Sequence, residues 1–178
     1  MAKKVYDVDK ELERIIGFIN NCDQKANILL AFVGVMITLL FTSTLPRKIS
    51  DIIIIPFVEY WQNNIGAFHC GRFILFLSIL SLCIFTICTL LNLIKVIKPQ
   101  LENKEAISHI YYAHIAHMKY EDFKNTSLDY DYKEDMYQQI YINAKICTNK
   151  FVNLRRATNC LIGMLVSCFL MYIILMFL

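Results

Sequence analysis

The chain reads ANILLAFVGVMITLLFTSTL over residues 26–45, a stretch without a charged side chain. Two more charge-free apolar stretches follow at 73–94 and 160–178. An α-helix needs about 20 consecutive apolar residues to cross the hydrocarbon core of a bilayer, and each stretch is about that long. We therefore expect an all-α membrane protein, in which three transmembrane helices continue into a cytoplasmic helical bundle.

The composition points to the same class of protein. Of the 178 residues, 57% are hydrophobic and 19% are charged, with a mean hydropathy of +0.46. Soluble domains average roughly 45–50% apolar and about 25% charged residues. These values exclude a free cytosolic enzyme, a secreted disulfide scaffold and a disordered tail. The net charge of +3 is too small to indicate nucleic acid as a partner.

Lysine and arginine are distributed unevenly around the apolar stretches. Five precede the first stretch, three lie in 46–72 and ten lie in 95–159. Cytoplasmic segments of membrane proteins carry the excess of these residues. We therefore expect the N-terminus and residues 95–159 on the cytoplasmic side, and 46–72 outside.

Six segments make up the expected organisation. They are a cytoplasmic amphipathic helix at 1–25, transmembrane helix 26–45, an extracytoplasmic loop at 46–72, transmembrane helix 73–94, a cytoplasmic helical region at 95–159 and transmembrane helix 160–178.

Spacing and proline positions predict where the helices end. Apolar residues recur at helical spacing between residues 5 and 22, so one long helix is expected to run on into the first span and to end at Pro46. Pro99 is expected to end the second span. Residues 101–124 are predicted to form one helix, and 130–178, whose only glycine is Gly163, another.

Two smaller features of the connecting segments carry predictions. Ser127 or Asp129 could cap the last helix, because both residue types accept hydrogen bonds from the first free amides. The apolar and aromatic residues at 52–61 are typical of an anchor at the membrane interface. A re-entrant or lid segment is the alternative for the same residues.

Basic side chains stand at the cytoplasmic ends of the spans. Simple anchoring explains them. The alternative is an electropositive pocket for a small anionic ligand, because the guanidinium group donates two parallel hydrogen bonds to phosphate. Asp23 and Lys25 are candidate structural or gating residues at the first membrane boundary. The candidate ligand-binding residues are Lys25, Asn27, Tyr112, His114, Lys150, Arg155 and Arg156.

Histidines and tyrosines are concentrated in the cytoplasmic region. His114, His117 and Glu121 would share a face of one helix, but without a fourth ligand at fixed spacing we expect no metal and no cofactor. We expect most tyrosines between 111 and 141 to be half-buried packing residues, with one or two free to stack on a nucleobase. Because no catalytic signature is found, no catalytic residue and no enzyme activity are expected.

Three stretches of the chain resemble one known family. Residues 23–30 read DQKANILL, which is similar to the D-x-K-A-x-x-L-L signature of the Pycsar transmembrane effectors, although Cys22 stands where that family often has a small residue. The resemblance extends from about residue 10 to the end. Two other stretches are similar. One is IYYAHIAHM at 110–118, followed by YEDF at 120–123, and the other is DMYQQIYINAKI at 135–146, followed by KF at 150–151 and LR at 154–155.

The resemblance implies a membrane effector of bacterial defence against phage. In that system a pyrimidine nucleotide cyclase makes cUMP or cCMP on infection, and the effector senses this ligand and impairs the inner membrane. The implied partners are the lipid bilayer, the cyclic mononucleotide, the cyclase as a functional link, and further copies of the chain. A homo-oligomer is expected because three spans cannot enclose a pore.

Three other functions remain open from the residues alone. A ligand-independent holin-like protein or small channel would be toxic without a second messenger. A membrane-anchored enzyme would use the histidine cluster. A scaffold would recruit a cytoplasmic partner through its long last helix.

Overall fold

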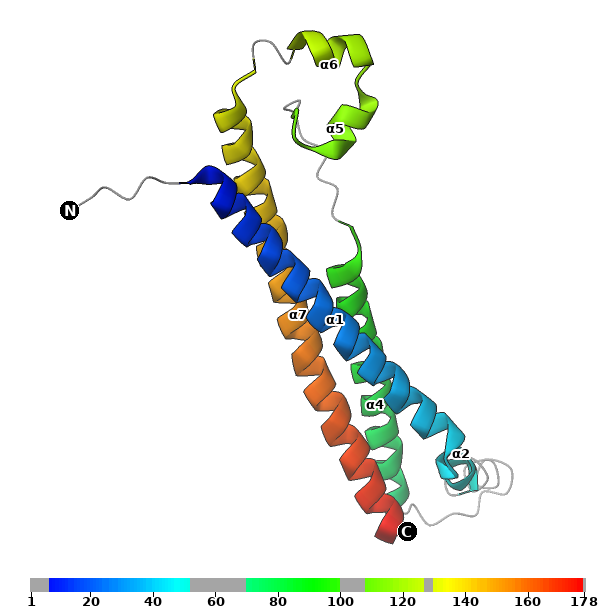
Figure 1. Cartoon of the computed structure of the whole chain (residues 1–178). Coiled ribbons are helices and arrows are strands. Elements are labelled where there is room, and N and C mark those ends of the chain that lie inside the picture. Colours follow the sequence, from blue (N-terminus) through cyan, green and yellow to red (C-terminus); the bar gives the residue numbers. More distant parts are fainter. Residues whose placement is uncertain (1–6, 52–69, 100–107, 127–129, 178) are drawn as a thin grey trace, which may run out of the picture. The chain divides into compact units, whose positions relative to one another are not determined.

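The structure, a computed structural model, describes residues 7–51, 70–99, 108–126 and 130–177. The described residues form six helices and no strand, which confirms the all-α class (Figure 1). The chain divides into two compact units. Unit 1 comprises Met1–Gln24 and Lys98–Val152, and unit 2 comprises Lys25–Ile97 and Asn153–Leu178.

The first long helix, α1, covers Val8–Thr42 and confirms that the N-terminal amphipathic stretch and the first apolar stretch form one helix. Its expected end at Pro46 is wrong. The helix stops at Thr42, and Pro46 lies instead in the first turn of the short helix α2, Leu45–Ile49. A proline is tolerated there because the first amides of a helix have no partner within the helix.

Helix α4 covers Cys70–Ile97 and stops before Pro99, as the proline predicts. Helix α7 covers Tyr132–Phe177 without a break, which confirms the single long C-terminal helix. Its first turn is capped by Asp131, whose Oδ1 accepts the backbone N–H groups of Lys133 at 3.1 Å and Glu134 at 3.3 Å.

The prediction of one helix over 101–124 is wrong for the residues that the structure describes, because they form two short helices. Helix α5 covers Tyr112–His117 and helix α6 covers Tyr120–Thr126, with Met118 extended between them. Residues 108–111 are not helical, because the Ser108 hydroxyl accepts the following backbone amides in place of a helical carbonyl. The predicted single helical face of His114, His117 and Glu121 is therefore wrong.

Some predictions concern residues outside the described ranges. They are the anchor or lid at 52–61, the beginning of the predicted helix at 101–107, and the caps Ser127 and Asp129.

Unit 2 is held together by apolar side chains from α1, α2, α4 and α7. A hydrogen bond of 2.9 Å between the Ser81 and Ser167 hydroxyls joins α4 to α7. Gly163 allows close approach of the same two helices, because a Cβ there would lie 2.7 Å from the Phe85 ring. The buried core consists of Val33, Leu45, Leu75, Leu82, Leu161, Met164, Cys168 and Met171.

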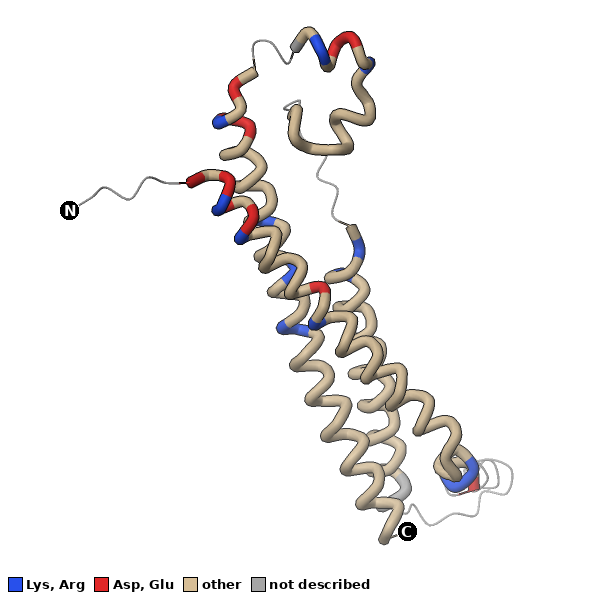
Figure 2. The backbone as a smooth tube through the Cα atoms, in the orientation of Figure 1, with Lys and Arg blue, Asp and Glu red and all other residues tan. Residues whose placement is uncertain are grey.

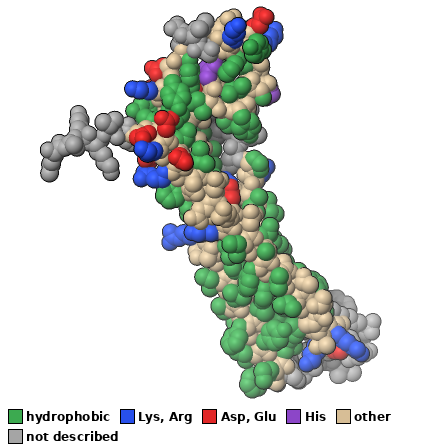
Figure 3. All heavy atoms as spheres, in the orientation of Figure 1, with side chains coloured by type: hydrophobic (Ala, Val, Ile, Leu, Met, Phe, Trp, Pro, Cys, Tyr) green, Lys and Arg blue, Asp and Glu red, His purple; other side chains and the backbone are tan. Residues whose placement is uncertain are grey.

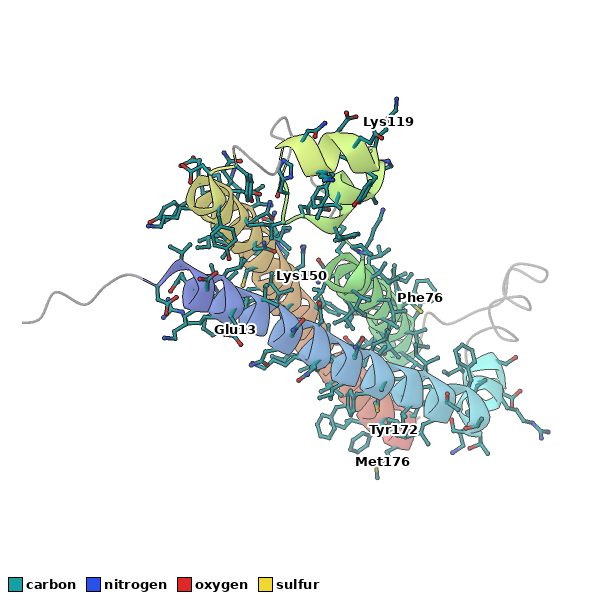
Figure 4. All side chains as sticks on the ribbon, turned by 45° about the horizontal axis from the view of Figure 1, so that its top comes forward. Glu13, Phe76, Lys119, Lys150, Tyr172 and Met176 are labelled. Atoms are coloured by element: carbon teal, nitrogen blue, oxygen red, sulfur yellow. The ribbon has the colours of Figure 1, made fainter. Side chains whose placement is uncertain are left out.

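Helices α1, α4 and α7 are each long and apolar enough to cross a membrane. The tube in Figure 2 has no charged residue along the three apolar stretches. Green apolar side chains cover much of the visible surface of unit 2 in Figure 3. Exposed apolar residues include Phe76 on α4 and Met176 on α7, both labelled in Figure 4. A surface of this kind suits lipid contact.

Candidate functional site

The Asp135 carboxylate, in the first turn of α7, is one centre of a polar network in unit 1. Its Oδ2 atom accepts hydrogen bonds from the Ser108 hydroxyl at 2.9 Å, the His109 backbone N–H at 2.9 Å and the Tyr130 hydroxyl. The Asp135 side chain is buried, with 6% of the residue exposed. Three donors on one oxygen hold the non-helical segment 108–111 against the start of α7.

Ser108 is the second centre of this network. Its hydroxyl accepts hydrogen bonds from the Gln139 side-chain amide at 3.0 Å and from the backbone N–H groups of Ile110 and Tyr111, at 3.2 and 3.0 Å. Its own backbone N–H donates to His114 Nδ1 at 3.1 Å. Because Nδ1 accepts this bond, a neutral His114 carries its proton on Nε2.

Aromatic rings surround the network. The His109 ring centroid lies 4.7 Å from that of Tyr130 and 5.6 Å from that of Phe123. Two buried atoms here have no hydrogen-bond partner among the described residues, Asp135 Oδ1 and His109 Nδ1. A carboxylate oxygen accepts N–H groups, and an imidazole nitrogen can accept or donate. We call Ser108, His109, Tyr130, Asp135 and Gln139 the Asp135 cluster.

The hydrogen bonds also set the protonation of the cluster. Burial alone raises the pKa of Asp135, but the bonds from Tyr130, Ser108 and the His109 amide outweigh burial and hold this pKa below its ordinary value of 3.8. Burial and the hydrogen bond to the Asp135 carboxylate raise the pKa of Tyr130 above its ordinary value of 10.0. At neutral pH the pair is thus a carboxylate and a neutral phenol.

A partly buried ion pair forms the second polar feature of unit 1. Lys150 Nζ on α7 lies 2.5 Å from Asp23 Oδ1 on α1. The Lys150 side chain is 6% exposed and the Asp23 side chain 33% exposed (Figure 4 labels Lys150). The structure thus brings together two residues that the sequence predicted for separate roles, an anion ligand and a gating residue. The Lys150 ammonium group is thus paired with Asp23, and an anionic ligand would have to replace Asp23 to bind it.

No side-chain hydrogen bond or ion pair joins the other predicted ligand residues to one another. In unit 1, Tyr112 on α5 is 68% exposed, while His114 is partly buried and bonded to Ser108. In unit 2 the remaining four residues are exposed, and none of their side chains forms a hydrogen bond or ion pair with the described residues. These four are Lys25, Asn27, Arg155 and Arg156.

The tyrosines between residues 111 and 141 differ in exposure. Tyr111 and Tyr130 are partly buried, as expected of packing residues. Tyr132 and Tyr137 are about half buried, with 49% and 47% of each residue exposed, so four of the seven tyrosines are at least half buried. The three more exposed residues are Tyr112, Tyr120 and Tyr141.

No three His, Cys, Asp or Glu side chains of the described ranges are grouped as metal ligands would be. The Asp135 cluster was missed by sequence reasoning, which singled out histidines and basic residues. The available signals were an acidic first turn, which is common at helix N-termini, and the family-like stretch 135–146, which did not show that Asp135 has a site role. Ser108 and Gln139 lie 31 positions apart and carry no pattern that joins them.

Fold and site together define an α-helical membrane protein with a polar helical unit. The model of the Pycsar effector protein domain matches residues 7–177, and the chain belongs to this family. Over 164 residues the chain is 25% identical to the Pycsar effector protein GmPycTM of Gulbenkiania mobilis. These residues make up 85% of this chain and 83% of that protein. No solved structure matches the chain.

The family match confirms the resemblance drawn from the three sequence stretches. Membership implies an effector of anti-phage defence, and the family is one of effectors and not of known enzymes.

Proposed function

We propose that the protein senses a cyclic pyrimidine mononucleotide, cUMP or cCMP, and responds by impairing the bacterial inner membrane as a homo-oligomer. The observation that carries this proposal is the family match over residues 7–177, which includes residues of both units. The chemistry of the two units supports a division of labour. Unit 1 contains the polar cluster and the aromatic side chains, and unit 2 contains the apolar helices.

The proposed ligand has one negative phosphate and one base with N–H groups. Uracil presents N3–H, and cytosine presents an exocyclic amine. Asp135 Oδ1 is a buried acceptor without a partner among the described residues, and His109 Nδ1 is a second such atom nearby in the network. We place the base at these two atoms, between aromatic rings that favour stacking. Both atoms are closed off in this state, so the segment 108–111 must open to admit the ligand.

The phosphate is assigned to basic residues. In unit 1 the phosphate would pair with the ammonium group of Lys150 and replace Asp23 as its partner. Lys25, Asn27, Arg155 and Arg156 remain proposed ligand residues from the sequence, together with Tyr112 and His114. A ligand can shift the packing of the helices only by its differential affinity for two states.

The proposal also includes an orientation. The count of lysines and arginines favours a cytoplasmic N-terminus and a cytoplasmic unit 1, where a cyclase would release the nucleotide.

Thermal unfolding of the detergent-purified protein tests ligand sensing. cUMP, cCMP, cyclic AMP and linear UMP are added separately to the wild type and to Asp135→Asn. A ligand that binds only the native state adds about 2.7 kcal/mol at a concentration a hundredfold above its dissociation constant. We expect a higher midpoint with one cyclic pyrimidine nucleotide, reduced in Asp135→Asn. No shift with any nucleotide in a folded protein would contradict the proposal and favour the ligand-independent channel.

A further inference from the structure

His114 holds the beginning of the segment 108–111 through one nitrogen of its ring. The Ser108 backbone N–H donates to His114 Nδ1 at 3.1 Å. Ser108 is only 3% exposed, so its amide has little access to water as another partner. His114 belongs to α5, and its own backbone N–H donates to the Tyr111 carbonyl at 3.0 Å. The Ser108–His114 bond therefore ties to α5 the segment that closes the Asp135 cluster.

This bond depends on a single lone pair of the imidazole. A neutral imidazole has one nitrogen that accepts and one that carries a proton, whereas a charged imidazole has two donors. The proton that charges His114 must therefore enter at Nδ1, where the lone pair holds the Ser108 amide. Two N–H groups would then point at each other, and repulsion would replace the hydrogen bond. Protonation of His114 and the closed position of the segment 108–111 thus exclude each other.

The titratable groups next to this bond keep one charge state between about pH 5 and pH 8, the range in which imidazole side chains gain a proton. On α7, Asp135 accepts the Ser108 hydroxyl, and its pKa is held below the ordinary value of 3.8. The pKa of Tyr130, which donates to the same carboxylate, is raised above 10.0. The Tyr111 ring packs edge-on against His114 with centroids 5.0 Å apart, and burial raises the pKa of its hydroxyl above 10.0.

The other described histidines differ from His114 in their contacts. His109 contributes its backbone N–H to the cluster, as a donor to Asp135 Oδ2 at 2.9 Å. Its ring nitrogen Nδ1 has no partner among the described residues, so a proton there displaces none of the hydrogen bonds of the cluster. His117, one turn after His114 in α5, is exposed. His114 is thus the histidine whose ring nitrogen accepts a hydrogen bond of the segment 108–111.

We propose that His114 is a positioning residue that holds the nucleotide site closed while its imidazole is neutral and releases the segment 108–111 when the imidazole gains a proton. The inference rests on the proposed function, because it assigns a regulator to the same site. A ligand that needs an open state binds with an apparent affinity reduced by the fraction of molecules that are open. Acid pH therefore lowers the nucleotide concentration that is needed. After release, the charged imidazole is free to pair with the phosphate, so this role precedes the ligand contact proposed for His114.

Hydrogen exchange of the Ser108 amide tests this role in the detergent-purified protein without nucleotide. Protection relative to the intrinsic exchange rate should be about threefold to tenfold lower at about pH 5 than at about pH 8. His114→Asn carries an acceptor oxygen on Cγ, where histidine carries Nδ1, and it gains no proton in this range. It should retain the protection at both pH values, whereas His114→Leu should lose it at both. His117→Asn is the matched control and should keep the pH dependence of the wild type.

Protection that does not change with pH in the wild type, or a pH dependence that persists in His114→Asn, would overturn the inference. Thermal shifts with cUMP and cCMP at both pH values are read separately. The effective nucleotide should act at a lower concentration at acid pH in the wild type but at equal concentrations in His114→Asn. Equal concentrations in the wild type would also overturn the regulatory role. If neither nucleotide shifts the midpoint at either pH, the proposed function fails, while the exchange of the Ser108 amide still decides the role of His114.

Discussion

Asp135 organises unit 1 because three donors converge on one of its oxygens. Asp135→Asn removes the charge that strengthens these bonds, at a cost of about 1–3 kcal/mol. We therefore expect the backbone amide of His109 to exchange its hydrogen about tenfold to a hundredfold faster. Hydrogen exchange with mass spectrometry measures this. Glu134→Gln, an exposed neighbour in the same turn, is the matched control and should leave the exchange rate unchanged.

The same cluster predicts a dependence of stability on pH. The pKa of Asp135 is lowered on folding, so its contribution is fully present above the ordinary value of 3.8 and is lost as pH falls through the folded-state pKa. The pKa of Tyr130 is raised, so its contribution is present below pH 10.0 and is lost as pH rises further. Unfolding midpoints are measured from acid to alkaline pH. Compared with the wild type, Asp135→Asn should lose less stability at acid pH, and Tyr130→Phe should lose less stability at alkaline pH. Unchanged losses would contradict these assignments.

The two partners of the ion pair differ in burial, so their single substitutions should differ in their cost to stability. Asp23→Asn leaves the ammonium of Lys150 buried without a carboxylate, a defect that costs about 3–5 kcal/mol when burial is complete. Lys150→Met leaves an Asp23 side chain that is one-third exposed and can hydrate, so it should cost less. Chemical unfolding of both single variants and of the double variant measures the coupling. Equal costs that simply add would contradict a coupled pair.

Sequence reasoning at the residue scale found Asp23 and Lys150 but not their contact, because 127 positions separate them. It missed the Asp135 cluster for the same reason. A serine, a tyrosine and a glutamine become a site only when a loop folds back onto a helix.

At the scale of elements, the long helices were predictable because their signals are local. An apolar stretch and the absence of proline are sufficient for α7, Tyr132–Phe177. The region 108–126 was not predictable in this way. Its non-helical start at 108–111 depends on hydrogen bonds of the Ser108 hydroxyl to Asp135 of α7 and to the backbone amides of Ile110 and Tyr111, which no periodicity reveals. Pro46 was likewise compatible with ending one helix or beginning the next.

The contact between α4 and α7 in unit 2 depends on Gly163. Gly163→Ala would place a Cβ 2.7 Å from the Phe85 ring, so we expect a loss of about 1–3 kcal/mol in stability from overpacking. Thermal unfolding in detergent measures this. Gly17→Ala is the control, because its Cβ would meet nothing within 4 Å among the described residues. The addition of Phe85→Leu to Gly163→Ala should recover part of the loss, and no recovery would contradict this cause.

For the whole molecule, we propose that unit 1 senses the ligand and that unit 2 acts on the membrane. Helices α1 and α7 each contribute residues to both units, so they are the elements through which ligand binding can act on the membrane helices. The linkage requires that the ligand binds one packing of these helices more tightly than the other.

Dye release from liposomes that contain the purified protein tests this coupling most directly. cUMP, cCMP, cyclic AMP and linear UMP are added to matched samples, with Asp135→Asn as the variant impaired in sensing. We expect release with one cyclic pyrimidine nucleotide alone, and a shift to higher nucleotide concentration in Asp135→Asn. Release that is equally fast without any nucleotide, or no release with any of them from a folded, inserted protein, would contradict the account.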